Sequence, residues 1–214
     1  DFFSTITFPR TRGLFSSLGY NSGVSSVLAL LCTDTDRREV VYQSENWYVS
    51  QGPRKLPQGA TTSPALSNLV ARNLDRRIRG YLKYLEDDWI YTRYADDLVL
   101  SHPDKNVDVG MLLTYLNRVI RDEGFKVNKK KTVIMRTPHR QMITGLVLHE
   151  SGVRVPKKYL KKVRAMVHNA DQLISKGFNP DNIDEIKGRL SFIKMVMPEY
   201  AEKTQAKYPW LKSA

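Results

Sequence analysis

The sequence predicts an α+β fold in which short antiparallel strand pairs alternate with amphipathic helices. Residues 89–94 and 98–100 alternate in side-chain character on either side of a tight turn, which is typical of a β-hairpin. Residues 66–85 and 109–120 instead carry apolar side chains at helical spacing. With 214 residues, of which 41% are hydrophobic, the chain can bury one large core or two small ones.

The first quarter of the chain is expected to form two helices and a hairpin. Residues 9–32 have helical spacing that breaks near residues 19–21. A charged loop is expected at residues 34–38. The alternation over residues 39–49 predicts a hairpin that ends at the turn-rich residues 51–53. This region by itself indicates no chemistry.

Two longer helices are expected in the middle of the chain. Ser63 can cap the first of them, and Pro64 suits its first position. The apolar stripe over residues 66–85 predicts the buried face of this helix. Asp104 is expected to cap the second helix, which should end at Gly124.

After Gly124, the chain is expected to contain a strand at residues 132–135 and a hairpin around residues 150–152, formed by residues 141–148 and 153–155. Two apolar stripes, over residues 160–174 and 183–197, then predict two helices that carry many basic side chains. This part of the sequence therefore has a small sheet followed by a helical end.

The chain is basic, and its charge is unevenly distributed. The sequence has 34 Lys and Arg against 22 Asp and Glu, a formal net charge of +12, which indicates a polyanionic partner. Residues 124–140 hold six Lys and Arg and no acidic residue. From Arg154 onward, 13 basic and 6 acidic residues give a surplus of +7.

Cysteine content and hydropathy indicate a cytoplasmic chain without a membrane partner. A single cysteine, Cys32, excludes an internal disulfide framework and suits a reducing cytosol. No stretch reaches the roughly 18 consecutive apolar residues of a membrane span, and no signal peptide is visible.

Two adjacent carboxylates, Asp96 and Asp97, lie on the turn of the hairpin expected at residues 89–100. Neighbouring like charges repel, so a cation is expected to offset them. A hard divalent ion with oxygen ligands fits, and magnesium is usual where phosphates are also bound. The plain alternative is an Asp-rich turn without a metal, since Asp is common in turns.

Four motifs, in their order and spacing, resemble those of reverse transcriptases. Tyr94-Ala95-Asp96-Asp97 resembles the family's metal-binding motif, and residues 56–64 (LPQGATTSP) resemble the nucleotide-pocket motif that precedes it. Residues 124–132 and 141–148 resemble the two motifs that follow. Ile143-Thr144-Gly145 and Leu18-Gly19-Tyr20 are similar to signatures of the bacterial retron-type branch. The similarity runs from residue 1 to about residue 200.

This resemblance implies a right-hand polymerase. Residues 1–155 would form part of the fingers and an RRM-like palm with an antiparallel sheet, and residues 156–214 a basic helical thumb. The implied activity is RNA-directed DNA synthesis, in which part of a structured non-coding RNA is copied into single-stranded DNA, in anti-phage defence. The implied partners are that RNA, an RNA–DNA duplex and deoxynucleoside triphosphates. An effector protein is a further candidate partner in the bacterial cytoplasm.

The resemblance also assigns roles to particular residues. Two Mg²⁺ ions would be held in part by Asp96, the principal ligand, and by Asp97, nearer the primer end. Phe3, Gln58 and Gly59 would line the nucleotide site, with Phe3 excluding a 2′-hydroxyl; plain core packing is its alternative. Lys131 is the candidate for protonating the pyrophosphate, or it belongs to a solvated basic run. The remaining assignments are nucleic-acid contacts: Arg93, Lys129, Lys130, Lys157, Lys158, Lys161 and Lys162.

The family's first catalytic carboxylate is expected three residues before the position of Asp1. It would lie on an upstream polymerase segment or on a separate chain, and Asp1 is not expected to replace it. The backbone of Asp1 and Phe2 would lie near the incoming triphosphate.

Two other functions fit the sequence. One is a non-catalytic scaffold that binds structured RNA. The other is a different bacterial reverse transcriptase, of the group II intron type or of another defence-associated class. The intron type is disfavoured by the expectation that no maturase-like extension follows Leu211.

Overall fold

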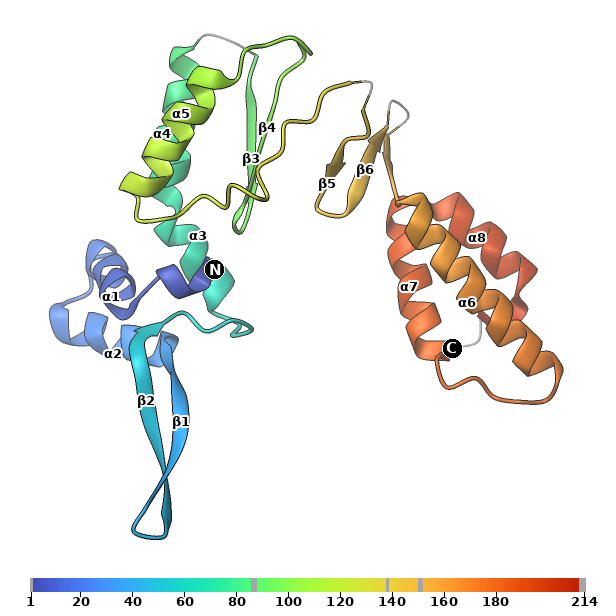
Figure 1. The fold of residues 1–214 in the computed structure, drawn as a ribbon, viewed down its shortest axis with the longest axis horizontal. Coiled ribbons are helices and arrows are strands. Elements are labelled where there is room, and N and C mark those ends of the chain that lie inside the picture. Colours follow the sequence, from blue (N-terminus) through green and yellow to red (C-terminus); the bar gives the residue numbers. More distant parts are fainter. Residues whose placement is uncertain (1, 86–87, 138, 150–151, 212–214) are drawn as a thin grey trace. The chain divides into compact units, whose positions relative to one another are not determined.

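A computed structural model describes residues 2–85, 88–137, 139–149 and 152–211 (Figure 1). The chain divides into two compact units, residues 1–133 and 134–214. Within the described residues, helices are accompanied by three small antiparallel sheets, which confirms the predicted mixture of helices and antiparallel strand pairs. The predicted division between residues 155 and 156 is a functional one and stays a prediction.

The first unit begins with two short α-helices. They follow a 3-10 helix, Phe3–Thr5, and are α1 (Phe8–Ser17) and α2 (Ser22–Cys32). The chain turns between them at Gly19, whose φ of 98° suits a residue without a Cβ. The Asn21 side chain then accepts a 2.9 Å hydrogen bond from the Val24 amide and caps α2. The predicted break near residues 19–21 is confirmed.

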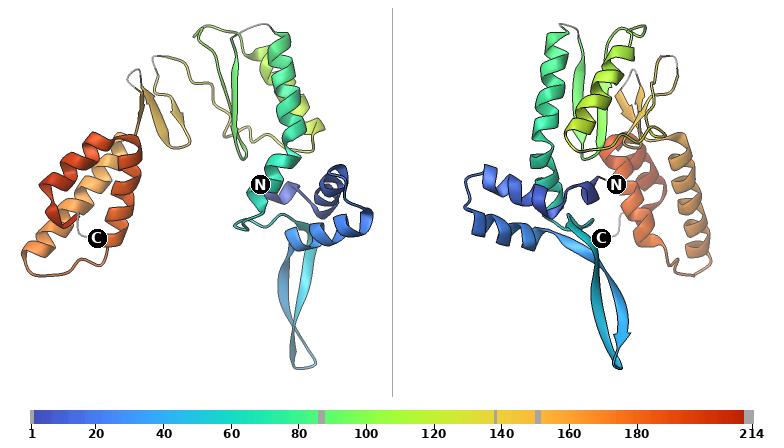
Figure 2. Two further views of the ribbon diagram at one scale, coloured as in Figure 1. Left: turned by 180° about the vertical axis from the view of Figure 1, so that it is seen from behind. Right: turned by 60° about the vertical axis from the view of Figure 1, so that its left-hand side comes forward.

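A long two-stranded hairpin extends away from α1 and α2 (Figures 1 and 2). It consists of β1 (Asp34–Tyr42) and β2 (Glu45–Lys55). Gln43 and Ser44, between the strands, have φ values of 51° and 64°. Two successive positive φ angles define a type I′ turn, whose twist matches that of the strands. The hairpin predicted over residues 39–49 is therefore confirmed.

Two predictions beside this hairpin are wrong. The sequence predicts a loop at residues 34–38 and a turn at residues 51–53, whereas both stretches are strand. The strand pairing contains a register shift between Asp34 and Asp36. There the buried Thr35 hydroxyl lies 3.1 Å from the carbonyl oxygens of Gln51 and Gly52. This irregularity lets charged and turn-forming residues remain in the ladder.

The helix predicted over residues 66–85 is divided in two. Its parts are α3 (Ser63–Val70) and α4 (Arg72–Tyr84). Ala71, between them, is fully buried and has a ψ of −1°, which interrupts the regular helix. Ser63 is not the cap, because Thr62 occupies that position. The Ser63 hydroxyl instead donates a 2.7 Å hydrogen bond to the Pro57 carbonyl.

The predicted hairpin with the two carboxylates is formed, but only Asp96 lies on its turn, because Asp97 already pairs within the second strand. It consists of β3 (Ile90–Tyr94) and β4 (Asp97–Ser101), with Tyr94 opposite Asp97. The next helix, α5 (Gly110–Asp122), begins later than predicted. The Asp104 carboxylate accepts a 2.8 Å hydrogen bond from the Asn106 amide in a local turn, so it caps no helix. Gly124, with a φ of 75°, follows the helix end as expected.

The core of the first unit lies between α4, α5 and one face of the β3–β4 hairpin (Figure 1). The rings of Tyr81 and Tyr115 stack 3.7 Å apart between the two helices. Leu98 and Leu100 pack on the same cluster from β4. The strand predicted at residues 132–135 is wrong, since these residues pair with no strand in the described part of the chain. Val133 and Ile134 are exposed rather than packed against a sheet.

The second unit has a three-stranded sheet followed by helices. The strands are β5 (Met142–Ile143), β6 (Leu146–His149) and β7 (Gly152–Arg154), and the helices are α6 (Lys157–Ser175), α7 (Ile183–Val196) and α8 (Pro198–Lys207), followed by the 3-10 helix Pro209–Leu211. The predicted pairing of β6 with β7 is confirmed, although residues 150 and 151 lie outside the described residues.

Helices α6 and α7 confirm the two predicted apolar stripes. Val163, Val167 and Ile186 are among their most deeply buried side chains. Helix α8 has no predicted counterpart, because Ala201 is its one buried side chain among the described residues. In the described part of the chain, no helix combines the length and the apolar character that a membrane span requires.

Candidate functional site

The end of the β3–β4 hairpin presents two carboxylates to solvent: Asp96 lies on the two-residue turn, and Asp97 is the first residue of β4. Both side chains are exposed. Within the described part of the chain, neither carboxylate forms a hydrogen bond or an ion pair with another side chain. Ala95, the first residue of this two-residue turn, has a φ of 50°. That conformation is costly for a residue with a Cβ, and such strain is often found at functional sites.

Arg93 stabilises the strained turn through hydrogen bonds. Its Nη1 donates a 3.0 Å hydrogen bond to the Ala95 carbonyl and a 2.9 Å bond to Oδ1 of Asn68 on α3. Its Nε and Nη2 each donate a 2.8 Å bond to the Asp75 carboxylate on α4. The Asp75 carboxylate also accepts a 2.8 Å bond from the Tyr91 hydroxyl. Two helices and the strand thus meet at one guanidinium group.

The electrostatics of this contact favour the ion pair. Burial alone raises the pKa of Asp75, but the hydrogen bonds from Arg93 and Tyr91 outweigh it and hold the pKa below its ordinary value. Burial, together with the hydrogen bond to Asp75, raises the pKa of Tyr91 far above its ordinary value. The hydrogen bond to Asp75 likewise raises the pKa of Arg93, despite burial. Near neutral pH, Asp75 is therefore ionised and both partners are protonated.

Asp96 and Asp97 fit part of a magnesium site. Mg²⁺ usually takes one or two carboxylates, and substrate phosphates and waters complete its six oxygen ligands. Two adjacent, exposed and unpaired carboxylates match that donor set. Among residues 2–85, 88–137, 139–149 and 152–211, no group of three or more His, Cys, Asp or Glu side chains is arranged to hold a metal ion. A metal ion bound by these two carboxylates would therefore need further ligands.

Gln58 and Gly59 lie on an exposed turn just before α3. Gly59 has a φ of 94°, and no atom lies within 4 Å of the position that a Cβ would occupy. A ligand can therefore approach this backbone closely. The turn is fixed at its base, where the Leu56 amide donates a 3.0 Å hydrogen bond to the Ile6 carbonyl. The segment that follows Phe3 is thus joined to the loop that carries Gln58.

Phe3 is partly buried against the core of the first unit. The centres of the Phe3 and Phe2 rings lie 5.5 Å apart in an edge-to-face arrangement, and those of the Phe2 and Phe125 rings lie 5.3 Å apart in a stacked one. Arg10 reinforces this contact, because its guanidinium lies 4.5 Å from the centre of the Phe125 ring and donates a 2.8 Å hydrogen bond to the Glu123 carbonyl. The first segment is therefore packed beside the segment that leads to the basic run. Asp1 lies outside the described residues.

Lys129, Lys130 and Lys131 are exposed on a turn that follows Phe125. The Asn128 side chain accepts a 3.1 Å hydrogen bond from the Lys130 amide, and its carbonyl accepts a 3.0 Å bond from the Lys131 amide. The local backbone is thus ordered while the three ammonium groups extend into solvent. Together with Phe3, Gln58, Gly59, Arg93 and the two aspartates, the run belongs to the first compact unit.

The four other predicted lysines belong to the second unit. Lys157, Lys158, Lys161 and Lys162 are all exposed in the first two turns of α6, whose first turn has no acidic residue. A helix N-terminus already carries partial positive charge, so four lysines there repel it and one another. A bound anion would relieve this repulsion.

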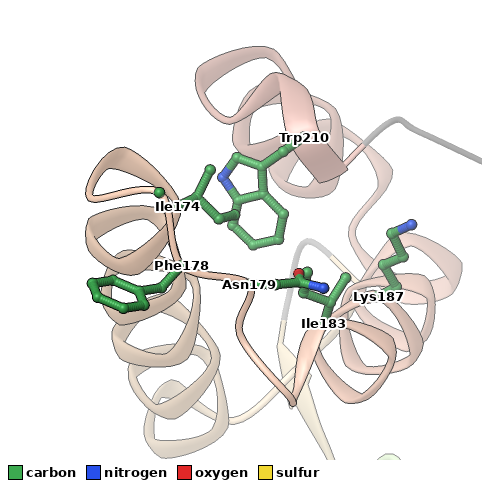
Figure 3. Close-up of a pocket in the computed structure, with 7 residues that line it drawn as sticks. Ile174, Phe178, Asn179, Ile183, Lys187 and Trp210 are labelled. Atoms are coloured by element: carbon green, nitrogen blue, oxygen red, sulfur yellow. The ribbon is translucent and has the colours of Figure 1, made fainter.

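An open cavity of about 420 Å³ in the second unit contains none of the predicted site residues. Figure 3 shows Ile174, Phe178, Ile183 and Trp210 around it, with Lys187 at its side. Nε1 of Trp210 donates a 3.1 Å hydrogen bond to Asp171, so the indole is fixed in place. The cavity is mostly apolar and offers little to a phosphate or a metal.

Sequence reasoning missed two residues of this site, Asn68 and Asp75. Their contacts with Arg93 span 25 and 18 residues along the chain, so no local pattern predicts them. A signal exists for Asp75, which is the only acidic residue in the otherwise basic stretch 72–79. The roles predicted for the individual site residues stay predictions.

Comparison with known proteins gives a consistent result. Residues 15–182 match the family described as reverse transcriptase (RNA-dependent DNA polymerase). The chain is 35% identical to the retron Mx162 reverse transcriptase of Myxococcus xanthus, over 92% of this chain and 43% of that protein. It is 36% identical to the retron Mx65 reverse transcriptase of Myxococcus xanthus, over 95% and 46%. With the retron Ec86 reverse transcriptase of Escherichia coli it shares 35% identity, over 97% and 59%. The chain spans about half the length of these relatives.

Proposed function

The chain belongs to the reverse transcriptase family, and on this premise we propose that it is the palm and thumb portion of a retron reverse transcriptase. The proposed reaction is RNA-directed DNA synthesis, in which a primer hydroxyl attacks the α-phosphate of a deoxynucleotide and pyrophosphate leaves. The observation that carries the proposal is the pair of exposed, unpaired carboxylates on the turn held by Arg93. The similarity to three retron enzymes supports the retron branch.

Asp96 and Asp97 would hold the metal ions of this reaction. When bound, two Mg²⁺ ions would supply Lewis-acid chemistry, by activating the attacking oxygen and stabilising the leaving one. Asp96 is proposed as the principal ligand and Asp97 as the secondary one, near the primer end. A further carboxylate, from outside the described residues, is proposed to complete the site.

The incoming deoxynucleotide would bind between the Phe3 segment and the Gln58 loop, which both belong to the first unit. Gln58 can both donate and accept hydrogen bonds, and Gly59 leaves space for a close backbone approach. Phe3 would limit the space beside the sugar C2′. The Leu56–Ile6 hydrogen bond supports this grouping, because it joins the Phe3 segment to the Gln58 loop. Lys131, on the exposed turn, would protonate the departing pyrophosphate.

The template and primer would be held by basic surfaces that recognise phosphates. We assign Lys129 and Lys130 of the first unit and the four lysines at the start of α6 to these contacts. Arg93 is also a predicted nucleic-acid contact, but in the structure its guanidinium faces Asp75, Asn68 and the Ala95 carbonyl. A structured non-coding RNA would be bound through its shape and backbone. A role in anti-phage defence with an effector protein, in the bacterial cytoplasm, completes the proposal.

The nucleic acid that accompanies the purified full-length protein tests the retron assignment. The expected finding is one short structured RNA joined through an internal guanosine 2′-hydroxyl to single-stranded DNA. Treatment with ribonuclease and with debranching enzyme would release the DNA in distinguishable forms. DNA without an RNA branch would favour another class of bacterial reverse transcriptase. RNA alone, with no DNA synthesis when primer and deoxynucleotides are added, would favour a non-catalytic RNA-binding scaffold.

A further inference from the structure

The hairpin end that carries Asp96, on the turn, and Asp97, at the start of β4, needs support from the rest of the fold. Ala95 adopts a φ of 50°, which an L-residue with a Cβ adopts only at a cost. The two neighbouring carboxylates also repel each other when no cation is bound. Unless other contacts fix it, a two-residue turn under both influences would relax and displace the carboxylates.

Arg93 supplies those contacts in a geometry that a lysine cannot reproduce. Its planar guanidinium spans the Asp75 carboxylate with two 2.8 Å hydrogen bonds and reaches the Ala95 carbonyl at 3.0 Å. Because the guanidinium is rigid, fixing one edge on Asp75 also fixes the direction of the bond to Ala95. The orientation of the turn is thereby tied to α4.

The Asp75–Arg93 pair is well shielded from solvent. The side chains are 9% exposed for Arg93 and 17% for Asp75. Shielded ion pairs often contribute little net stability compared with apolar side chains of the same volume, and some are retained because they fix one conformation. An apolar pair could not donate to the Ala95 carbonyl. The contact is therefore better explained by positioning than by stability.

The same arginine also reaches the helix that follows the Gln58 loop. Asn68 of α3 accepts a 2.9 Å hydrogen bond from Arg93. Five residues earlier, the Ser63 hydroxyl at the start of α3 donates a 2.7 Å bond to the Pro57 carbonyl, next to Gln58. A short helix is rigid, so α3 acts as a spacer of fixed length between the two loops.

From these contacts we propose that Arg93, aligned by Asp75 and linked to Asn68, is a positioning residue for the metal site. It sets the orientation of the Asp96–Asp97 turn and its distance from the Gln58–Gly59 loop. This inference rests on the proposed function, since it assumes that the turn binds metal and the loop binds the nucleotide. It assigns Arg93 a role within the protein rather than a contact with nucleic acid.

The test compares Arg93→Lys and Asp75→Asn with the wild type in the full-length protein. Primer extension on an annealed DNA primer and RNA template gives kcat, the deoxynucleotide KM and the Mg²⁺ concentration for half-maximal rate. Binding of Mn²⁺, followed by electron paramagnetic resonance, reports the metal site without turnover. We expect kcat to fall about 10- to 100-fold, because small misplacements of reacting groups cost about that much. The apparent affinities for both metals should fall at least about threefold, which a loss of nucleic-acid contact alone would not cause.

Arg77→Lys is the matched control. Arg77 lies on α4, as Asp75 does, and pairs with two acids, Asp122 at 3.0 Å and Glu123 at 2.8 Å; among the described residues, none of its ion pairs reaches the turn. The Arg77→Lys variant should have a lowered melting temperature, as Arg93→Lys should, but its rate should depend on Mg²⁺ concentration as that of the wild type does. Asn68→Ala removes one exposed partner without disturbing the ion pair and should raise the Mg²⁺ requirement to a smaller extent.

Several outcomes would overturn the inference. It fails if Arg93→Lys and Arg77→Lys have the same kcat and bind Mn²⁺ as the wild type does. Loss of RNA binding by Arg93→Lys with unchanged Mn²⁺ affinity would restore the nucleic-acid role and reject positioning. If the wild type extends no primer, the proposed function fails. The Mn²⁺ titration then decides separately whether Arg93 positions the carboxylates.

Discussion

Arg93 and Asp75 face each other across β3 and α4 in a two-bond ion pair, with both bonds at 2.8 Å. The Asp75 carboxylate also accepts a hydrogen bond from the Tyr91 hydroxyl, and Arg93 also donates one to the Ala95 carbonyl. A well-shielded ion pair is thus linked through the Ala95 carbonyl to the turn beside the exposed aspartates. This arrangement has consequences for stability, pH dependence and metal binding.

The first prediction concerns stability and pH. The pKa of Asp75 is lowered in the folded state, so its stabilising contribution is present above the unfolded pKa of about 3.9 and is lost as pH falls through the folded value. The melting-temperature advantage of the wild type over Asp75→Asn should therefore shrink as pH is lowered from about 6 to about 3. Arg93→Ala should cost about 3–5 kcal/mol near neutral pH, because it leaves a shielded charge unpaired. An advantage that does not change with pH would contradict this account.

The second prediction concerns Gly59. Gly59→Ala should raise the deoxynucleotide KM of the full-length protein. The added methyl group meets no protein atom within 4 Å but would occupy the surface proposed for the nucleotide. The positive φ should also cost about 1–2 kcal/mol of stability. Gly80→Ala is the control, because Gly80 lies in the middle of α4 with its surface open to solvent. There, alanine should stabilise the helix by about 0.5–1 kcal/mol and leave KM unchanged. An unaltered KM in Gly59→Ala would remove the loop from the nucleotide site.

The third prediction concerns the start of α6. Changing Lys157, Lys158, Lys161 and Lys162 to Gln should weaken the binding of unrelated duplexes to a similar degree. It should also lower the slope of log K against log salt by about 3, because each lost phosphate contact removes about 0.7–0.9. Four exposed lysines elsewhere in the second unit provide the control set: Lys176, Lys194, Lys203 and Lys207. Equal slopes for the two fourfold variants would show that charge in general, and not this helix end, attracts the nucleic acid.

The fourth prediction distinguishes sugar selection from packing at Phe3. Phe3→Val should increase ribonucleotide incorporation relative to deoxynucleotide incorporation, since it enlarges the space proposed beside C2′. Phe2 is the comparison, because its ring stacks on Phe125 at 5.3 Å and belongs to the same aromatic cluster. Phe2→Leu should lower the melting temperature without changing sugar selectivity. A Phe3→Val protein that is destabilised but keeps its selectivity would support core packing alone.

Local patterns predicted much of the secondary structure. The turns at Gly19 and Gly124 and the apolar stripes of α6 and α7 were visible because glycine conformation and helical spacing are local properties. Predictions failed where a distant contact decided the local structure. The Thr35 hydroxyl stabilises a strand across from Gln51, and Ser63 bonds to Pro57 instead of capping its own helix.

The same distinction between local patterns and distant contacts applies to the candidate site. Motif resemblance indicated Asp96, Asp97, Gln58 and Gly59, because their order along the chain is itself the signal. The support beneath them was not predictable, since Asn68 and Asp75 act through hydrogen bonds to Arg93 that form only in the folded chain. The sequence thus indicated the residues proposed to meet metal and substrate, whereas the structure was needed to find those that hold them.

Primer extension by the Asp96→Ala, Asp97→Ala double variant tests the central claim most directly. The measurement uses the full-length protein with an annealed primer and RNA template in Mg²⁺, and a parallel assay measures RNA binding. Both carboxylates are exposed and unpaired within the described residues, so the double variant should fold and bind RNA as the wild type does. DNA synthesis should fall below about a hundredth of the wild-type rate, which corresponds to about 2.7 kcal/mol of barrier. Extension above that level with RNA binding intact would contradict the assignment of the two aspartates as metal ligands.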